Sequence, residues 1–455
     1  MGVQWNDGQA DAAFAQARQA GLPLFLYWGA AWCPPCNRIR ATVFERADFA
    51  QLASSFVALH IDGDSAGAQQ LAERFHVRSY PTLIVYRPDG TEITRLPCEL
   101  DGERFMEILR VALSARRTVA ESLSAALSRE RPLSDDEWRL LSFYSWDTDE
   151  RQVLKSLDFA ATLASMTRAC TLPDAMLRLQ WHTLHAAAMS GKGGIDQRAA
   201  VQRLEETLAD APAVRAQMDI VSNHAVDLAR FLTAAQSPAR IRLTQAWARA
   251  LEQLENDPTL NLADQLAALR TRVRMSRLGA QIEGLEDVAR ERVARAGEAV
   301  LGPAMRHQVM NTAAGVLSDA GLLDEAEQLL LDELERSHAP YFFMHNLATI
   351  AKKRGDPASA VLWYERAWES ATGPATRLQW GASYLQGLID FAPHEAPRIE
   401  LFASKLLEEL DGMGDAFFQR NRTQMERIDS KLALWSGAST YSAALRQAAR
   451  AAAGH

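Results

Sequence analysis

Two cysteines separated by two residues lie near the beginning of the chain, in the run Trp32-Cys33-Pro34-Pro35-Cys36. A pair in this spacing, between an apolar strand and the first turn of a helix, is typical of a redox-active dithiol. Because N–H groups at a helix start carry partial positive charge, the thiolate of Cys33 is favoured, and we expect Cys33 to be the nucleophile. Cys36, one helical turn later, is expected to resolve a mixed disulfide formed on Cys33. The motif therefore predicts thiol–disulfide exchange.

The residues next to the cysteines are expected to tune the site and to contact substrate. Pro34 and Pro35 suit a helix start, and they remove N–H donors that could bond the sulfur, so we expect them to affect the redox poise. Trp32 could offer a flat apolar surface to a protein substrate, and packing in the core is an equally good interpretation.

The other cysteines bear on two further interpretations. A zinc site would need two more ligands at suitable spacing, and Cys98 and Cys170 do not form a second such pair. The prolines between the first two cysteines favour redox chemistry, and we expect neither a metal nor a cofactor. Cys98, which follows Pro97, is a candidate third thiol able to react with Cys33; the alternative is a small residue that packs in a loop.

The apolar periodicity around the motif predicts a small domain in which helices and strands alternate. Strands joined through helices are expected to be parallel, and a hairpin with a turn at residues 88–90 adds one antiparallel edge strand. In order, the predicted elements are a helix at 7–20, a strand at 22–28, the dithiol helix to 44, a strand at 56–62, a helix at 66–77, strands at 82–87 and 91–96, and a helix that ends near 115.

These features resemble the thioredoxin superfamily over residues 1–115. The cysteine motif stands at the family's active-site position, and the run 79–82, Ser-Tyr-Pro-Thr, looks like its second signature, a cis-proline that opens the strand facing the dithiol. The resemblance implies that Pro81 is cis. It also implies that the backbone of Tyr80 pairs with the substrate polypeptide beside Cys33.

Two details separate the sequence from small thioredoxins. The family commonly buries an aspartate six residues before the first cysteine, paired with a lysine on the next strand, to take the proton of the resolving thiol. Tyr27 and Ala58 stand at these positions, so the sequence does not identify a general base. The opening helix, with Trp5, looks more like the bacterial branch that includes the C-terminal domains of interchange proteins.

From residue 118 onward the sequence predicts helices alone. A helical linker at 116–133 is expected to lead into an all-α domain at 134–455, whose first helix begins with a capping box formed by Ser134 and Glu137. The predicted fold class is therefore an α/β thioredoxin fold followed by a large all-α helical-repeat domain.

A 34-residue repeat occurs within residues 305–375, where Gly321 and Ala326 recur as Gly355 and Ala360. This period resembles the tetratricopeptide repeat. Because two repeats cannot stand alone, we expect neighbouring helices to continue a degenerate solenoid. Such a superhelix offers a concave surface, so the helical domain is expected to recruit a protein partner.

The composition argues against several functional classes. The 455 residues include 49 basic and 57 acidic side chains, a net charge of −8, and a nucleic-acid partner is not expected. No apolar stretch approaches the roughly 20 residues of a membrane span, and we expect no membrane partner. The first residues lack the features of a secretion signal, and four cysteines suit a reducing compartment, so we expect the cytoplasm; the periplasm is the alternative if a signal peptide was removed.

The sequence as a whole predicts a thiol–disulfide oxidoreductase that acts on protein disulfides or dithiols and exchanges electrons with an upstream redox partner. A non-catalytic adaptor or chaperone-like protein, which would use the thioredoxin fold only as a binding platform, is the alternative from another class. Among enzymes, the alternative is a periplasmic disulfide oxidase or isomerase.

Overall fold

A five-stranded mixed sheet forms the centre of the N-terminal domain in the computed structural model, which describes residues 3–149, 152–191, 194–411 and 413–436. The strands lie in the order β1-β3-β2-β4-β5, with β2 parallel to β3 and antiparallel to β4. Every residue of β2 is buried, as expected for a strand covered on both faces. The strands are β1 (Trp5–Asp7), β2 (Leu24–Gly29), β3 (Val57–Asp62), β4 (Thr82–Tyr86) and β5 (Glu92–Leu96).

Five helices accompany the sheet, and α2, which carries the cysteines, continues into a π-helical turn at Arg40–Phe44. They are α1 (Ala10–Ala20), α2 (Pro34–Ile39), α3 (Ala47–Leu52), α4 (Ala68–Arg74) and α5 (Gly102–Ser114). The sequence predicts most of these elements, but it assigns Asp7 to a helix. That assignment is wrong, because Asp7 belongs to β1, which pairs with β3, and α1 begins only at Ala10.

The direction of β4 also differs from the prediction that strands joined through helices are parallel. α4 has seven residues and therefore spans about 10 Å, which is about half the length of β3. It does not carry the chain back to the start of β3. Thr82, the first residue of β4, therefore pairs with Trp28 near the end of β2, close to the end of β3 at Asp62. As a result, β4 runs antiparallel to β2.

The rest of the described chain is helical. A predicted capping box at Ser134 and Glu137 is confirmed at the start of α7. The helices are α6 (Val119–Ser128), α7 (Asp135–Ser142), α8 (Phe159–Ala169), α9 (Pro173–Ser190), α10 (Gln197–Leu208), α11 (Ala211–Ala216), α12 (Met218–Asn223), α13 (Ala225–Leu232), α14 (Pro238–Glu255), α15 (Leu262–Met275), α16 (Leu285–Glu298), α17 (Pro303–Ala320), α18 (Leu323–Leu334), α19 (Pro340–Arg354), α20 (Pro357–Ser370), α21 (Pro374–Phe391), α22 (Ala396–Asp411) and α23 (Gln419–Ser436).

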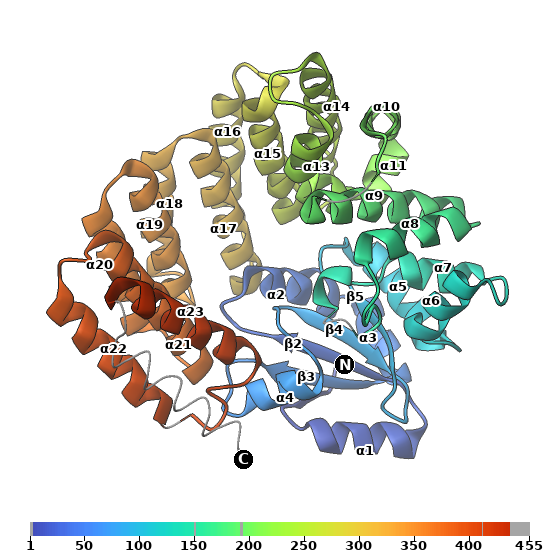
Figure 1. The fold of residues 1–455 in the computed structure, drawn as a ribbon, viewed down its shortest axis with the longest axis horizontal. Helices are drawn as coiled ribbons and strands as arrows, with labels where there is room; N and C mark the ends of the chain where they lie inside the picture. The colour runs from blue at the N-terminus through green and yellow to red at the C-terminus, as the bar shows by residue number, and fades with distance from the viewer. Residues whose placement is uncertain (1–2, 150–151, 192–193, 412, 437–455) are drawn as a thin grey trace.

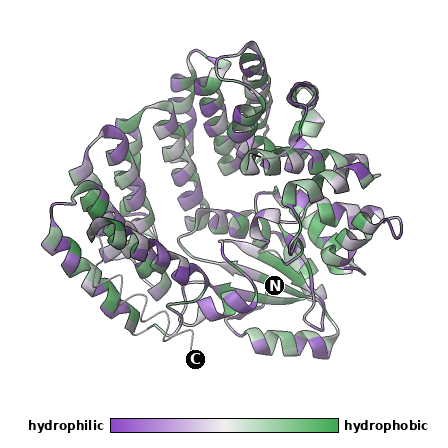
Figure 2. Cartoon of the chain, in the orientation of Figure 1, coloured by the Kyte–Doolittle hydropathy of each residue, from purple (hydrophilic) through white to green (hydrophobic). Residues whose placement is uncertain are grey.

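The helices after α5 curve around the N-terminal domain (Figure 1). α17 packs against α2, α23 packs against α4 and α7 packs against α5, so separate parts of the helical region contact the small domain (Figure 1). One apolar core continues through both parts and includes Phe25 of β2, Trp138 of α7 and Trp380 of α21. Figure 2 shows apolar strands at the centre and surrounding helices that carry both polar and apolar residues. The concave side of the helical region therefore faces the chain's own small domain.

The 34-residue correspondence is visible in the helix pairs α17–α18 and α19–α20. Gly321 and Gly355 end the first helix of each pair with φ values of 86° and 72°, a left-handed conformation that glycine adopts without strain. Ala326 and Ala360, at the start of the second helices, are fully buried. The assignment to the tetratricopeptide repeat stays a prediction. Among the described residues, no helix has the length and apolar character that crossing a membrane requires.

Candidate active site

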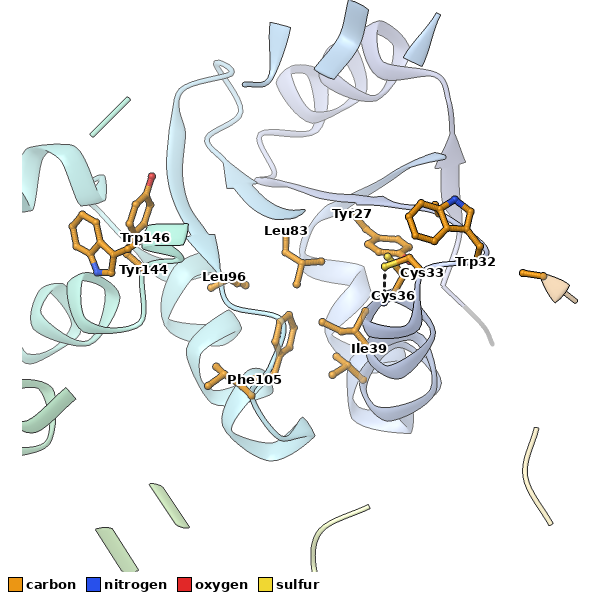
Figure 3. Packing of buried hydrophobic residues seen from close by; sticks show 14 of the residues in the cluster. Tyr27, Trp32, Cys33, Cys36, Ile39, Leu83, Leu96, Phe105, Tyr144 and Trp146 are labelled. Carbon is orange, nitrogen blue, oxygen red and sulfur yellow. Dashed lines mark hydrogen bonds between the residues drawn. The ribbon is translucent and has the colours of Figure 1, made fainter. Parts of the chain in front are cut away.

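Cys33 caps the N-terminus of α2, and Cys36 lies one turn further along the helix. The backbone of Cys33 is extended, and its Sγ accepts a hydrogen bond from the backbone N–H of Cys36 at 3.4 Å (Figure 3). Pro34 and Pro35 occupy the first two helical positions and have no N–H, so the Cys36 N–H is the first that the helix can offer to the sulfur. Both cysteines carry free thiols.

The two thiols have different surroundings. Cys36 is completely buried, whereas 3% of Cys33 remains exposed. Burial, followed by the contact with Cys33, raises the pKa of Cys36 well above its ordinary value. The Tyr27 hydroxyl on β2 hydrogen-bonds the Cys36 thiol and acts in the opposite direction. Because burial also raises the pKa of Tyr27 well above its ordinary value, the phenol stays protonated and can donate to a Cys36 thiolate.

The neighbours of Tyr27 fix its ring beside the dithiol. A Cβ atom at Gly29 would lie 2.4 Å from the Tyr27 hydroxyl oxygen, so only glycine leaves room for the ring there. On its other side the ring stacks on His60, with centroids 4.9 Å apart and planes 15° apart. His60 in turn contacts a carboxylate oxygen of Asp7 through Nδ1 at 2.8 Å. Tyr27 thus places a neutral hydrogen-bond donor where the family commonly has an aspartate, and Ala58, at the position of the family's lysine, is buried and apolar.

Trp32 is held between the small domain and the helical region. Its indole N–H donates to Asp64 at 2.6 Å, and Thr376 of α21 donates to the same carboxylate oxygen. Its ring stacks on Phe342 of α19, at 6.0 Å between centroids, and meets the edge of Trp380. Only 6% of Trp32 is exposed, so the flat surface expected for a protein substrate is covered by the chain's own aromatic residues.

Tyr80 and Pro81 lie opposite the cysteines, immediately before β4. The peptide bond between them is cis. The Tyr80 hydroxyl accepts a hydrogen bond from Gln69 at 3.2 Å, and its ring fills the space beside Gly63. The structure therefore brings Tyr80 to the same cavity as Cys33, as the resemblance implies, and binding of a substrate backbone there stays a prediction.

Cys33 lines a cavity of about 830 Å³ that is bounded by both parts of the chain. Tyr80 and the residues before it form one side. Arg270 of α15, Gln308 of α17 and Arg427 of α23 belong to the opposite walls. A disulfide that reacts with Cys33 must therefore enter this cavity.

A buried ion pair fixes α2 against the helical region, and the sequence analysis missed it. Arg38 donates from Nε and Nη2 to the two carboxylate oxygens of Asp264 at 2.6 and 2.9 Å. The guanidinium also donates to the backbone carbonyls of residues 98–100. No short motif could have revealed a pair whose members are 226 positions apart.

Two histidines of the helical region hold the backbone that leads into the dithiol. His307 Nε2 contacts the carbonyl oxygen of Trp32 at 3.1 Å, and His338 Nε2 contacts that of Ala31 at 2.8 Å. Burial, followed by the nearby His338, lowers the pKa of His307 to about 4, so its ring is neutral near pH 7 and can donate one N–H to the carbonyl. The motif is therefore positioned by contacts from outside its own domain.

Cys98 is not on the wall that Cys33 faces. It lines a neighbouring cavity of about 380 Å³, which it shares with Glu99, Asp219 and His224. Burial, followed by the charge of Glu99, raises the pKa of Cys98 well above its ordinary value. A role as third thiol stays a prediction. Cys170 is buried in the helical region.

Comparison with known proteins agrees with the geometry of the small domain. Residues 10–113 match the family model of a thioredoxin-like domain. The chain is 34% identical over 108 residues to the thiol:disulfide interchange protein DsbD 1 of Pseudomonas aeruginosa, a match that covers 23% of this chain and 18% of that protein. It is 32% identical over 91 residues to a thioredoxin H-type of Oryza sativa subsp. indica, covering 20% of this chain and 70% of the relative. It is 26% identical over 82 residues to the mitochondrial thioredoxin O2 of Arabidopsis thaliana, covering 18% and 50%.

Proposed function

This chain belongs to the thioredoxin-like family through its N-terminal domain, and on that premise we propose that it is an enzyme that exchanges disulfides through Cys33 and Cys36. The observation that carries the proposal is the position of the two thiols. Cys33 lies at the start of a helix and on the wall of a cavity, and Cys36 is enclosed directly behind it. This arrangement provides one thiol for attack and a second for resolution.

The exchange transfers two electrons and proceeds in two steps. The Cys33 thiolate attacks one sulfur of a disulfide, forms a mixed disulfide and releases the other sulfur, which takes up a proton. Cys36 then loses its proton and attacks the Cys33 sulfur, which forms the Cys33–Cys36 disulfide and releases the second thiol. The same steps in reverse oxidise a dithiol. An upstream redox partner that restores the starting state belongs to the proposal.

Resolution depends on Cys36 as a thiolate, which its burial disfavours. A backbone hydrogen bond from Ala30, followed by the side-chain hydrogen bond from the Tyr27 hydroxyl, favours this thiolate. Tyr27 therefore acts in our proposal as a positioning and stabilising donor. The proton leaves to the departing thiolate or to water in the cavity.

The helical region acts in this proposal as a selector. Its contacts with Trp32 and Arg38 keep it over the dithiol, so a folded protein surface cannot reach Cys33 while these contacts are intact. A protein disulfide is a substrate when a flexible segment presents it in the cavity. A protein partner that delivers such a segment to the outer helices is part of the same proposal.

The test is to trap the mixed disulfide. Reduced Cys36→Ser protein is mixed with hydroxyethyl disulfide and analysed by intact mass and peptide mapping. We expect one adduct, located on Cys33, to accumulate, while Cys33→Ser accumulates none and Cys170→Ser behaves as the unmodified protein does. Adducts on Cys98 instead of Cys33, or no adduct at all, would refute the exchange and favour the alternative of a non-catalytic adaptor.

A further inference from the structure

The cavity in front of Cys33 has a strong positive charge. Five arginines line it, and none of its lining residues in the described chain is an aspartate or a glutamate; these arginines are Arg78, Arg270, Arg274, Arg420 and Arg427. The chain as a whole has a net charge of −8, so this concentration of arginine is not a property of the average surface. A cavity lined by charges of one sign concentrates ligands of the opposite sign.

The carboxylate of Asp319, which lies behind this wall, does not cancel the charge. Asp319 on α17 accepts hydrogen bonds from Arg270 Nε at 2.8 Å and from Arg274 Nε at 2.7 Å, and Lys353 Nζ lies 3.5 Å from its other oxygen. One carboxylate is therefore shared among three cations. The pairings fix Arg270 and Arg274 in place and leave a net positive charge at the cavity.

A further arginine lies directly beside the cysteine motif. The Arg420 guanidinium lies 5.0 Å from the ring centroid of Trp32 and 4.5 Å from that of Tyr80. It also donates to the side-chain oxygen of Gln379 and is thereby oriented from the helical side. Stacked guanidinium groups keep N–H donors free at their edge, and these suit carboxylate or phosphate oxygens.

We propose that this cavity selects disulfides that carry negative charge close to the reacting sulfurs. The inference rests on the proposed exchange through Cys33 and adds the chemical class of the substrate. The arginines bind carboxylate or phosphate groups and place a neighbouring sulfur at Cys33. The reaction is unchanged: two electrons pass from the dithiol to the disulfide, and two thiols leave with the two protons.

Two sources could supply this chemistry, a small anionic disulfide or an acidic segment of a protein. The volume of about 830 Å³ admits either one, provided that the segment is extended. Their shared feature is an acidic group within a few bonds of the disulfide. The experiment below therefore contains an arm for each source.

The experiment compares three small disulfides of similar size, which are dianionic dithiodipropionate, neutral hydroxyethyl disulfide and dicationic cystamine. The rate of oxidation of the reduced full-length protein is measured at low ionic strength and divided by the rate with free dithiothreitol, which corrects for intrinsic reactivity. We expect the corrected rate for dithiodipropionate to exceed that for cystamine by about ten-fold or more, and the ratio to shrink in high salt. Equal corrected rates would overturn the proposal and leave the exchange function intact. No oxidation by any of the three would refute the exchange itself.

Variants locate the effect in the cavity. Arg427→Gln and the double variant Arg274→Gln/Arg427→Gln are expected to lower the preference for dithiodipropionate over cystamine several-fold. Urea unfolding of each variant shows whether it is folded. Arg295→Gln, on the outer surface of α16, is the matched control and is expected to retain the full preference. An equal loss in Arg295→Gln, or no loss in the double variant, would contradict the assignment to this cavity.

The second arm uses two flexible peptides with one intramolecular disulfide each, identical except for acidic or basic residues next to the cysteines. Faster oxidation by the acidic peptide supports the proposal. If the corrected rate of the acidic peptide exceeds that of dithiodipropionate, the substrate is a protein segment. If it is lower, the substrate is a small molecule. Faster oxidation by the basic peptide would contradict the proposal for both sources.

Discussion

The guanidinium of Arg38 and the carboxylate of Asp264 form a bidentate ion pair in which the side chains are only 7% and 6% exposed. Arg38 lies two positions after the resolving thiol, and Asp264 lies in the first turn of α15. The pair therefore couples the position of the dithiol helix to the helical region. A buried pair of this kind is costly to break, because the remaining charge has no partner.

Asp264→Asn should destabilise the protein by about 3–5 kcal/mol, since it leaves the Arg38 charge buried and unpaired. Urea unfolding of the reduced protein measures this change. Asp287→Asn is the matched control, because Asp287 forms an exposed pair with Arg290 and its loss should cost about 0–1 kcal/mol. Equal effects of the two substitutions would show that the buried pair does not hold α2 in place.

Tyr27→Phe should slow the resolution of a mixed disulfide on Cys33 by about ten-fold near pH 7, because the Cys36 thiolate loses a hydrogen bond, and a hydrogen bond to a charged group contributes about 1.5–3 kcal/mol. The pKa of Cys36 is raised by burial and then by Cys33, so its thiolate fraction, and with it the resolution rate, increases with pH in both proteins. Loss of the Tyr27 hydrogen bond should move the profile to higher pH. Rapid quenching and mass analysis at a series of pH values measure the rate.

The control for this prediction is Tyr86→Phe, which removes a buried hydroxyl from a different apolar cluster of the same sheet. Its pH profile should match that of the unmodified protein. If Tyr27→Phe also gives an unshifted profile, the Tyr27 hydroxyl does not stabilise the Cys36 thiolate.

Acidification should destabilise the protein through its buried histidines. Burial lowers the pKa of both His307 and His345 to about 4, below the unfolded value of about 6.5. Between these values the unfolded chain binds more protons than the folded one, so the free energy of unfolding falls as the pH falls from about 6.5 towards 4. His307→Gln, which keeps a donor for the Trp32 carbonyl, should reduce this dependence.

Urea unfolding at about pH 7, 6 and 5 measures this dependence for each protein. Exposed His394 provides the control, and His394→Gln should leave the curve unchanged. If His307→Gln retains the full acid dependence, the ring of His307 does not contribute to it.

Cys33 should discriminate between reagents by size, because only 3% of it is exposed and its cavity is bounded by both domains. Iodoacetamide should label it, whereas a polyethylene-glycol maleimide should react at a rate reduced by about ten-fold or more relative to a small maleimide, since it requires local opening. Asp264→Asn should reduce this difference. A bulky reagent that labels Cys33 as fast as the small one would show that the helical region does not close the site.

Much of the redox domain could be predicted because its signals are local. The spacing of Cys33 and Cys36 after an apolar run predicts their position at a helix start, and the structure has it. The short strand at Trp5 was missed, because three residues give too little periodicity. The direction of β4 depends on the length of α4 relative to the strands, which a general rule for strands joined by helices does not include.

The enclosure of the site could not be predicted, because it depends on contacts between residues far apart in the sequence. Arg270 and Arg274 follow the ordinary pattern of a solvated helix face, and only the curvature of the helical region turns them towards Cys33. His307 and His338 show no metal-ligand spacing, and their partners are backbone carbonyls that no sequence pattern reveals. The repeat pattern predicts a concave surface on the helical region that binds a protein partner. In the structure, the redox domain of the same chain lies against that surface (Figure 1).

In our proposal Cys33 and Cys36 form a reversible redox couple beside this cavity, and an equilibrium titration of the full-length protein in glutathione buffers measures that couple. The fraction oxidised is read by alkylation and intact mass. We expect a single two-electron transition that is absent from Cys33→Ser and Cys36→Ser; a midpoint near about −270 mV would indicate a reductant, and one near about −120 to −180 mV an oxidase or isomerase. If the pair shows no reversible transition at any potential, Cys33 and Cys36 are not a redox centre, and the proposed exchange does not occur.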